Sequence, residues 1–121
     1  MSDRSEAPVA SPWRWMLGGA ALHNWVVALP VLLTPGTGPT DRVVAVLVAG
    51  FGLLYALVAR QPARLASALW AGVLGKLGVL WVMVPGVLAG RAVAGTGAVL
   101  AGDLLFTLAF LGFLLTRRRA G

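Results

Sequence analysis

Four long apolar stretches divide this chain of 121 residues, and they constrain its fold more than any other feature. They cover residues 13–33, 43–59, 65–84 and 92–115, and nearly all charged residues lie between or beyond them. A helix needs about 20 apolar residues to cross the roughly 30 Å hydrocarbon core of a bilayer. Only 12% of the residues are charged, whereas a soluble domain usually has about 25%. The sequence therefore predicts four membrane-spanning helices.

The connections between the stretches contain residues that begin or end helices. Thr40 is expected to cap the second helix, with Asp41 favourably placed in its first turn. Residues 60–64 form a tight basic turn, and Pro85 with the following glycine is expected to end the third helix. The expected helices cover about residues 13–33, 42–60, 64–84 and 92–115.

The distribution of arginine predicts how the chain is oriented. Seven arginines lie in the two ends of the chain and in the second connection, whereas the first and third connections hold only Arg42 and Arg91. By the positive-inside bias, both termini then face the cytoplasm. We expect an all-α, four-transmembrane-helix antiparallel bundle over residues 13–116, in a bacterial cytoplasmic (inner) membrane. Residues 1–12 are expected to be a short disordered cytoplasmic tail, and residues 117–121 a basic one.

The net charge of +6 also comes from basic residues that flank the membrane-spanning stretches. A nucleic-acid-binding protein would gather its basic residues on one face, but here they flank the apolar stretches. They indicate contact with lipid headgroups, and no nucleic-acid partner is expected.

Two charged residues lie deep inside the apolar stretches, Lys76 in the third and Asp103 in the fourth. A charge at the centre of a membrane helix costs about 2.5–3.5 kcal/mol on insertion scales. Because the two charges are opposite and lie at similar depth, we expect them to pair. His23, Asn24 and Tyr55 lie at roughly the same level and are candidate hydrogen-bond partners. These five residues form the predicted ligand or proton site.

Two interpretations of this polar site stay open. In the first, it is a midplane pocket that binds or moves a small solute or a proton. In the second, the Lys76–Asp103 pair fixes helix register in an accessory or scaffold subunit of a membrane complex that has no chemistry of its own. A membrane enzyme acting on lipid or quinone is a weaker hypothesis, because the sequence has no acidic pair and no cysteine. Whether the protein is an enzyme is therefore uncertain, and the sequence leans against it.

Small residues recur at helix-packing spacing and let neighbouring backbones approach closely. Together with the short chain, they suggest a homo-oligomer or a partner within a membrane complex, in addition to the lipid bilayer. The expected packing positions are Ala45, Ala49, Gly52, Ala56, Gly72, Gly75 and Gly102.

No metal site or cofactor is expected, because the chain has one histidine, no cysteine and no cluster of carboxylates. Haem ligated by two histidines would require a dimer that brings two copies of His23 together.

Several short motifs follow one another along the chain. They are Ala21-Leu22-His23-Asn24, Gly50-Phe51-Gly52-Leu53-Leu54-Tyr55-Ala56, Arg60-Gln61-Pro62, Gly72-Val73-Leu74-Gly75-Lys76 and Gly102-Asp103-Leu104.

With these motifs, the chain resembles a family of small bacterial four-helix membrane proteins over about residues 17–115. Members often have an alkyl-hydroperoxide-reductase name, which a chain without cysteine cannot justify. The family commonly has tyrosine at the position of His23 and asparagine at that of Gly102, so this chain departs from it beside the predicted site. The resemblance implies the four-helix topology and this choice of site residues.

Overall fold

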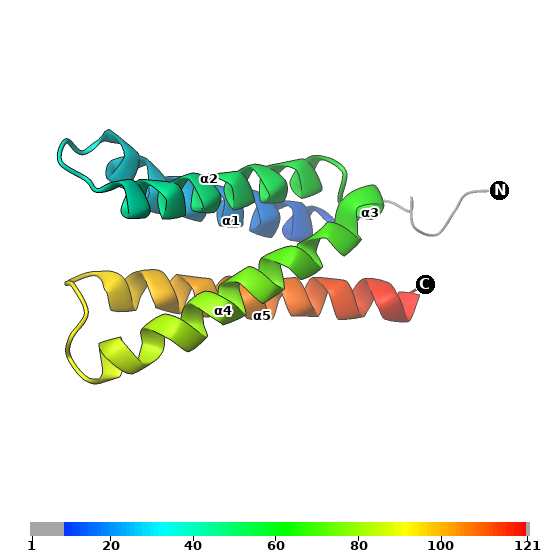
Figure 1. The fold of residues 1–121 in the computed structure, drawn as a ribbon. Helices are drawn as coiled ribbons and strands as arrows, with labels where there is room; N and C mark the ends of the chain where they lie inside the picture. The colour runs from blue at the N-terminus through cyan, green and yellow to red at the C-terminus, as the bar shows by residue number, and fades with distance from the viewer. Residues whose placement is uncertain (1–8, 121) are drawn as a thin grey trace. The chain divides into compact units, whose positions relative to one another are not determined.

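The computed structural model of the chain describes residues 9–120, and all regular elements in that range are helical. Four of these helices are long, and two short elements connect the second long helix to the third (Figure 1). In chain order they are α1 (Ser11–Leu33), α2 (Pro39–Arg60), α3 (Pro62–Leu65), the 3₁₀ turn η2 (Ala66–Ala68), α4 (Leu69–Leu88) and α5 (Thr96–Ala120).

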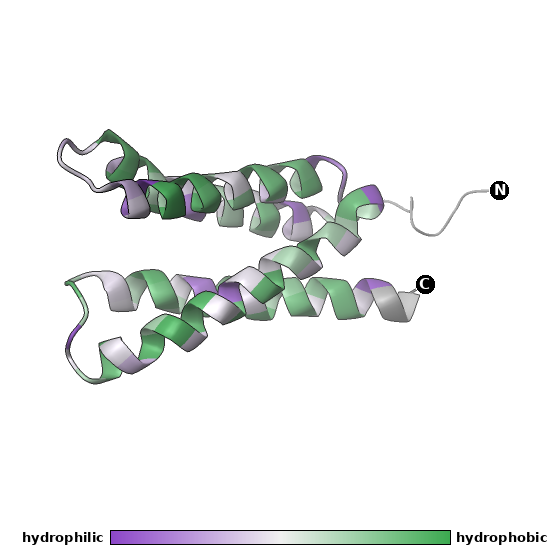
Figure 2. Ribbon diagram, viewed as in Figure 1, coloured by the Kyte–Doolittle hydropathy of each residue, from purple (hydrophilic) through white to green (hydrophobic). Residues whose placement is uncertain are grey.

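Within residues 9–120, four helical stretches are long and apolar enough to cross a membrane. They are Ser11–Leu33, Pro39–Arg60, Pro62–Leu88 and Thr96–Arg117. Figure 2 shows hydrophobic residues over most of the length of the long helices. Many large apolar side chains are exposed, and Trp81 reaches 84%. Because water would oppose so much apolar surface, the helices suit a lipid environment, and the prediction of an all-helical chain able to span a membrane four times is confirmed.

The chain divides into two compact units, Met1–Ala66 and Ser67–Gly121, and each is described by itself. In the first unit, α1 packs on α2. The buried residues of α1 follow the spacing of one helix face. They are Leu17, Ala20, Ala21, Asn24 and Ala28.

Hydrogen bonds from α1 side chains set the register of this first pair of helices. Arg14 Nε donates to the carbonyl of Ala59 at 3.2 Å, and Asn24 Nδ2 donates to that of Val48 at 3.0 Å. Residue numbers rise along α1 as they fall along α2, so the two helices of this unit run in opposite directions.

In the second unit, α4 packs on α5. The buried residues of α4 also lie on one face, because their spacing is three, one and three residues. They are Leu69, Gly72, Val73 and Lys76. On α5, the buried residues are Leu100, Asp103, Thr107, Phe110, Phe113 and Leu114.

The second helix begins earlier than expected, and Thr40 is not its cap. Gly38 occupies the N-cap position without a side-chain hydrogen bond, and Pro39 begins the helix. Proline suits this position because its φ is already helical and its missing N–H would have no partner there. Asp41 does lie in the first turn.

The predicted basic turn at residues 60–64 is in fact a single residue, Gln61. It has φ −133° and ψ 60°, and it separates the last residue of α2 from the first residue of α3. A residue before proline is disfavoured in the α conformation, so Pro62 breaks the helix at Gln61. Pro62 then begins the next helix, and the carbonyl of Gln61 accepts from Leu65 N–H at 2.9 Å.

Pro85 does not end the third span, because α4 continues to Leu88. Proline removes one N–H donor, but its φ is helical, and its own carbonyl accepts from Ala89 N–H at 3.0 Å. Ala89 is the C-cap of α4, and the residue after it, Gly90, has a φ of +75°, which favours glycine. Gly90 N–H donates to the carbonyl of Val87, and the next residue, Arg91, donates to Gly86. This pair of bonds is a Schellman motif.

The ends of the chain also differ from the predicted tails where they are described. α1 begins at Ser11, within the range predicted as a tail, whereas residues 1–8 lie outside the described residues. At the other end, α5 continues through the predicted basic tail to Ala120.

Candidate functional site

The most polar feature of the second unit is an ion pair between Lys76 on α4 and Asp103 on α5. Lys76 Nζ lies 2.7 Å from Asp103 Oδ1, and the two side chains are only 5% and 13% exposed. The bond joins two helices that follow each other in the chain. In surroundings poor in water, each charge is the main compensation for the other.

Two further side chains of α5 surround this pair. Lys76 Nζ lies 6.0 Å from the centre of the Phe106 ring, within the range of a cation–π contact. The hydroxyl of Thr107 is 1% exposed and donates to the backbone carbonyl of Asp103 at 2.6 Å.

The sequence analysis missed both Phe106 and Thr107. Their spacing is a signal that could have found them, because residues three and four positions after Asp103 lie on the same helix face.

In the first unit, Asn24 is an interhelical hydrogen-bond donor. Its amide donates to the carbonyl of Val48, and the indole Nε1–H of Trp25 donates to the next carbonyl, that of Ala49, at 3.2 Å. Two consecutive residues of α1 therefore hold two consecutive carbonyls of α2. Trp25 was not among the predicted site residues. Its position next to Asn24 in the sequence does not indicate this contact.

Gly52 explains how Trp25 can approach α2 so closely. A Cβ atom at Gly52 would lie 2.6 Å from Trp25 Nε1 and 2.9 Å from Trp25 Cδ1, distances that side chains do not tolerate. The glycine thus makes room for the indole.

The remaining predicted site residues also belong to the first unit. Tyr55 is 1% exposed, and its ring lies 6.3 Å from that of Phe51 in a tilted arrangement. His23 is half-buried on α1. The structure brings together Lys76 and Asp103 in one unit and describes Asn24, His23 and Tyr55 in the other, so a single five-residue site stays a prediction.

None of the predicted packing residues is exposed. Three are buried, namely Ala45, Gly52 and Gly72, and four are half-buried, namely Ala49, Ala56, Gly75 and Gly102.

In the part of the chain that the structure describes, no three side chains of His, Cys, Asp or Glu gather as they would in a metal site. This observation does not test the predicted absence of a cofactor, and it does not test the alternative of haem ligated by two copies of His23 in a dimer.

The chain was compared with known proteins, and no family model, curated protein or solved structure matches it. The resemblance to the family of small four-helix membrane proteins therefore stays a prediction.

Proposed function

We propose that this chain is an integral protein of a bacterial inner membrane in which Lys76 and Asp103 bind or move a small solute or a proton. The observation that carries the proposal is the buried contact of 2.7 Å between the two side chains. Charged groups inside a membrane protein are costly and usually mark a polar pathway or site. Small residues could fix the packing of α4 on α5 without that cost.

The pair supplies complementary chemistry. The ammonium of Lys76 is a donor, and the carboxylate of Asp103 is an acceptor. A solute with an acidic and a basic group can exchange with both partners, and a proton can pass between the nitrogen and the oxygen. The proposed assembly is a homo-oligomer of four-helix antiparallel bundles.

Proton movement through the pair can be measured in proteoliposomes that contain a trapped pH-sensitive dye. With a potassium diffusion potential across the membrane, the wild-type protein should acidify or alkalinise the lumen faster than protein-free liposomes do. Asp103→Asn and Lys76→Met should each abolish this flux. The double variant Lys76→Met/Asp103→Leu should fold, because both buried charges are gone, and still show no flux. Flux at the wild-type rate in the double variant would overturn the proposal.

A second candidate function is that of an accessory or scaffold subunit. The observation in its favour is that the ion pair joins α4 directly to α5, as a purely structural contact would. In this case the double variant should still co-purify from the native membrane with the partner subunit that co-purifies with the wild-type chain. A folded double variant that loses the partner would contradict a replaceable structural pair.

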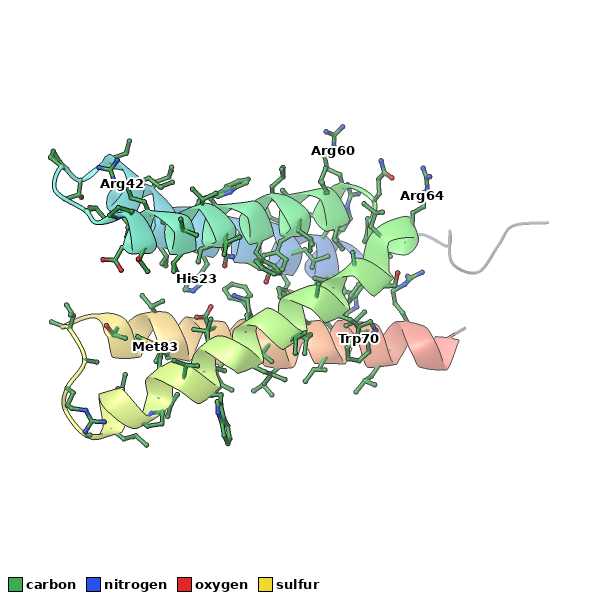
Figure 3. The ribbon with its side chains drawn as sticks, in the orientation of Figure 1. His23, Arg42, Arg60, Arg64, Trp70 and Met83 are labelled. Carbon is green, nitrogen blue, oxygen red and sulfur yellow. The ribbon has the colours of Figure 1, made fainter. Side chains whose placement is uncertain are left out.

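The proposed orientation places both termini in the cytoplasm. In the first unit, Arg60 and Arg64 lie at one end of the hairpin and Arg42 lies at the other (Figure 3), in agreement with the positive-inside bias.

Because the chain has no cysteine, single-cysteine variants test this orientation directly. Thr40→Cys and Gln61→Cys introduce a thiol at exposed positions on opposite ends of α2. An impermeant maleimide should label Thr40→Cys in intact spheroplasts, and it should label Gln61→Cys only after the membrane is opened. The reverse pattern would show that the termini face outward.

A further inference from the structure

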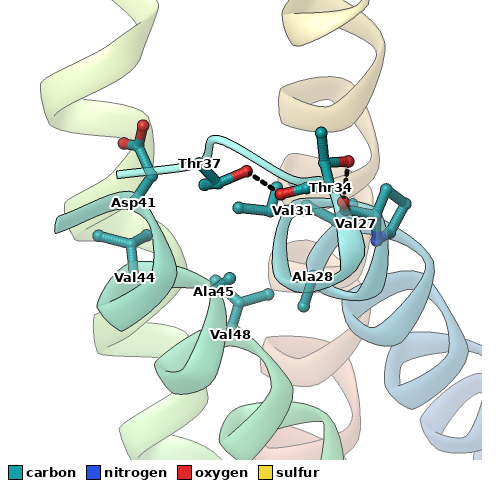
Figure 4. Close-up of a pocket in the computed structure, with 10 residues that line it drawn as sticks. Val27, Ala28, Val31, Thr34, Thr37, Asp41, Val44, Ala45 and Val48 are labelled. Carbon is teal, nitrogen blue, oxygen red and sulfur yellow. Dashed lines mark hydrogen bonds between the residues drawn. The ribbon is translucent and has the colours of Figure 1, made fainter. Parts of the chain in front are cut away.

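The first unit has a pocket of about 460 Å³ at the end of the hairpin where α1 connects to α2 (Figure 4). This volume lies within the range of sites for small organic molecules, roughly 300–1,000 Å³. All residues that line the pocket belong to the first unit, and most of them are apolar. They are Val27, Ala28, Pro30, Val31, Thr34, Thr37, Asp41, Val44, Ala45 and Val48.

The polar side chains at the rim of the pocket can offer a ligand acceptors but no free donors. The hydroxyl of Thr34 donates to the carbonyl of Pro30, and the hydroxyl of Thr37 donates to that of Thr34 at 2.8 Å. Each hydroxyl has one proton, so both protons are already used. The third polar side chain, Asp41, is an exposed carboxylate.

The charge of Asp41 distinguishes this rim from a neutral groove. Within the described residues, no recorded ion pair includes Asp41. Arg42 follows it in the chain, but Arg42 does not line the pocket. The pocket therefore combines an apolar wall with one negative charge at its edge.

We propose that this pocket binds a lipophilic organic cation. The apolar body of the ligand lies against Val31, Val44 and Val48, and its positive centre lies beside the carboxylate of Asp41. The occupant is a free molecule rather than a membrane phospholipid. This site shares no residue with the Lys76–Asp103 pair, so neither proposal depends on the other.

Two probes with nearly the same shape and opposite charge test the proposal. The full-length protein in an uncharged sugar-headgroup detergent is dialysed to equilibrium against tetraphenylphosphonium or tetraphenylborate. The cation should bind in a saturable way, and the anion should not. Asp41→Asn should weaken binding of the cation by up to about fivefold, the factor expected when an exposed charge pair worth up to about 1 kcal/mol is lost. Arg42→Gln removes the neighbouring charge and should leave the affinity equal or tighter. Equal binding of both probes, or no effect of Asp41→Asn, would overturn the proposal.

A matched pair of valines tests the location of the site. Val44 lines the pocket, whereas Val46 does not, and the two side chains are similarly exposed, 53% and 56%. Val44→Phe should fill the pocket and weaken binding of tetraphenylphosphonium, whereas Val46→Phe should leave it unchanged. An equal effect of both changes would place the binding elsewhere.

A binding measurement with added lipid distinguishes a pocket for a free cation from a pocket for a phospholipid headgroup. Phosphatidylethanolamine also has a positive amine and apolar chains, and it can be added to the detergent micelles. Unchanged affinity for tetraphenylphosphonium would support the proposal. Competitive loss of binding that disappears in Asp41→Asn would assign the pocket to a lipid headgroup and overturn it.

Discussion

Replacing Asp103 with leucine is expected to destabilise the second unit by about 3–5 kcal/mol. Removing one partner of a buried ion pair leaves the other charge uncompensated, and losses of this size are typical. Lys76 is only 5% exposed, and the ring of Phe106 can replace only a small part of the lost attraction, about 0.5–2 kcal/mol. Thermal unfolding in detergent, followed by circular dichroism or by tryptophan fluorescence, should show the fall in stability.

The double variant Lys76→Met/Asp103→Leu is the control for this effect. It removes both charges and keeps side chains of similar volume, so it should recover most of the stability that the single variant loses. Leu105→Ala is a second control, because Leu105 lies on the same helix and is 65% exposed. A single Asp103→Leu variant as stable as the wild type would mean that water or lipid headgroups already compensate Lys76.

The second large effect is expected from Gly52→Ala, which should destabilise the first unit by about 1–3 kcal/mol, as overpacking in a well-packed core does. The new Cβ would lie 2.6 Å from Trp25 Nε1, so the indole must move. Movement of the ring would break its hydrogen bond to the carbonyl of Ala49. Trp25 fluorescence should therefore change together with the unfolding temperature.

Gly50→Ala is the matched control on the same helix. A Cβ at Gly50 meets nothing within 4 Å, so this change should be neutral or should stabilise the helix by up to about 1 kcal/mol. Trp25→Leu combined with Gly52→Ala should lose less stability than the two single changes added together, because both remove the same contact. Equal effects of Gly50→Ala and Gly52→Ala would contradict the close approach of Trp25.

The four spans could be predicted from the sequence because a hydrophobic run of sufficient length has few alternatives to a membrane helix. The ends of the helices could not. Proline gives two opposite signals, since Pro39 and Pro62 begin helices whereas Pro85 lies inside α4 without ending it. Pro39 and Pro62 stand at the start of a helix, where the missing N–H has no partner to lose. Helical hydrogen bonding continues beyond Pro85, whose carbonyl accepts from Ala89 N–H.

For the candidate site, the pairing of Lys76 with Asp103 could be predicted because they are opposite charges inside consecutive apolar stretches. The spacing of Phe106 and Thr107 places them on the same helix face as Asp103, but it does not reveal their contacts with the pair, because such residues are common in any membrane helix. Trp25 was still harder to foresee, since its role depends on the space at Gly52, one residue of a helix that is distant in the sequence.

The ion pair also bears on how the chain is made. Lys76 emerges from the ribosome before Asp103, and α4 inserted alone would carry an unpaired ammonium into the hydrocarbon at a cost of about 2.5–3.5 kcal/mol. Only residues 89–95 separate α4 from α5, so the two helices are close enough to enter the bilayer together as one hairpin. With both present, each charge already has its partner. The short connection and the pair it brings together therefore favour insertion of the second half of the chain as a single step.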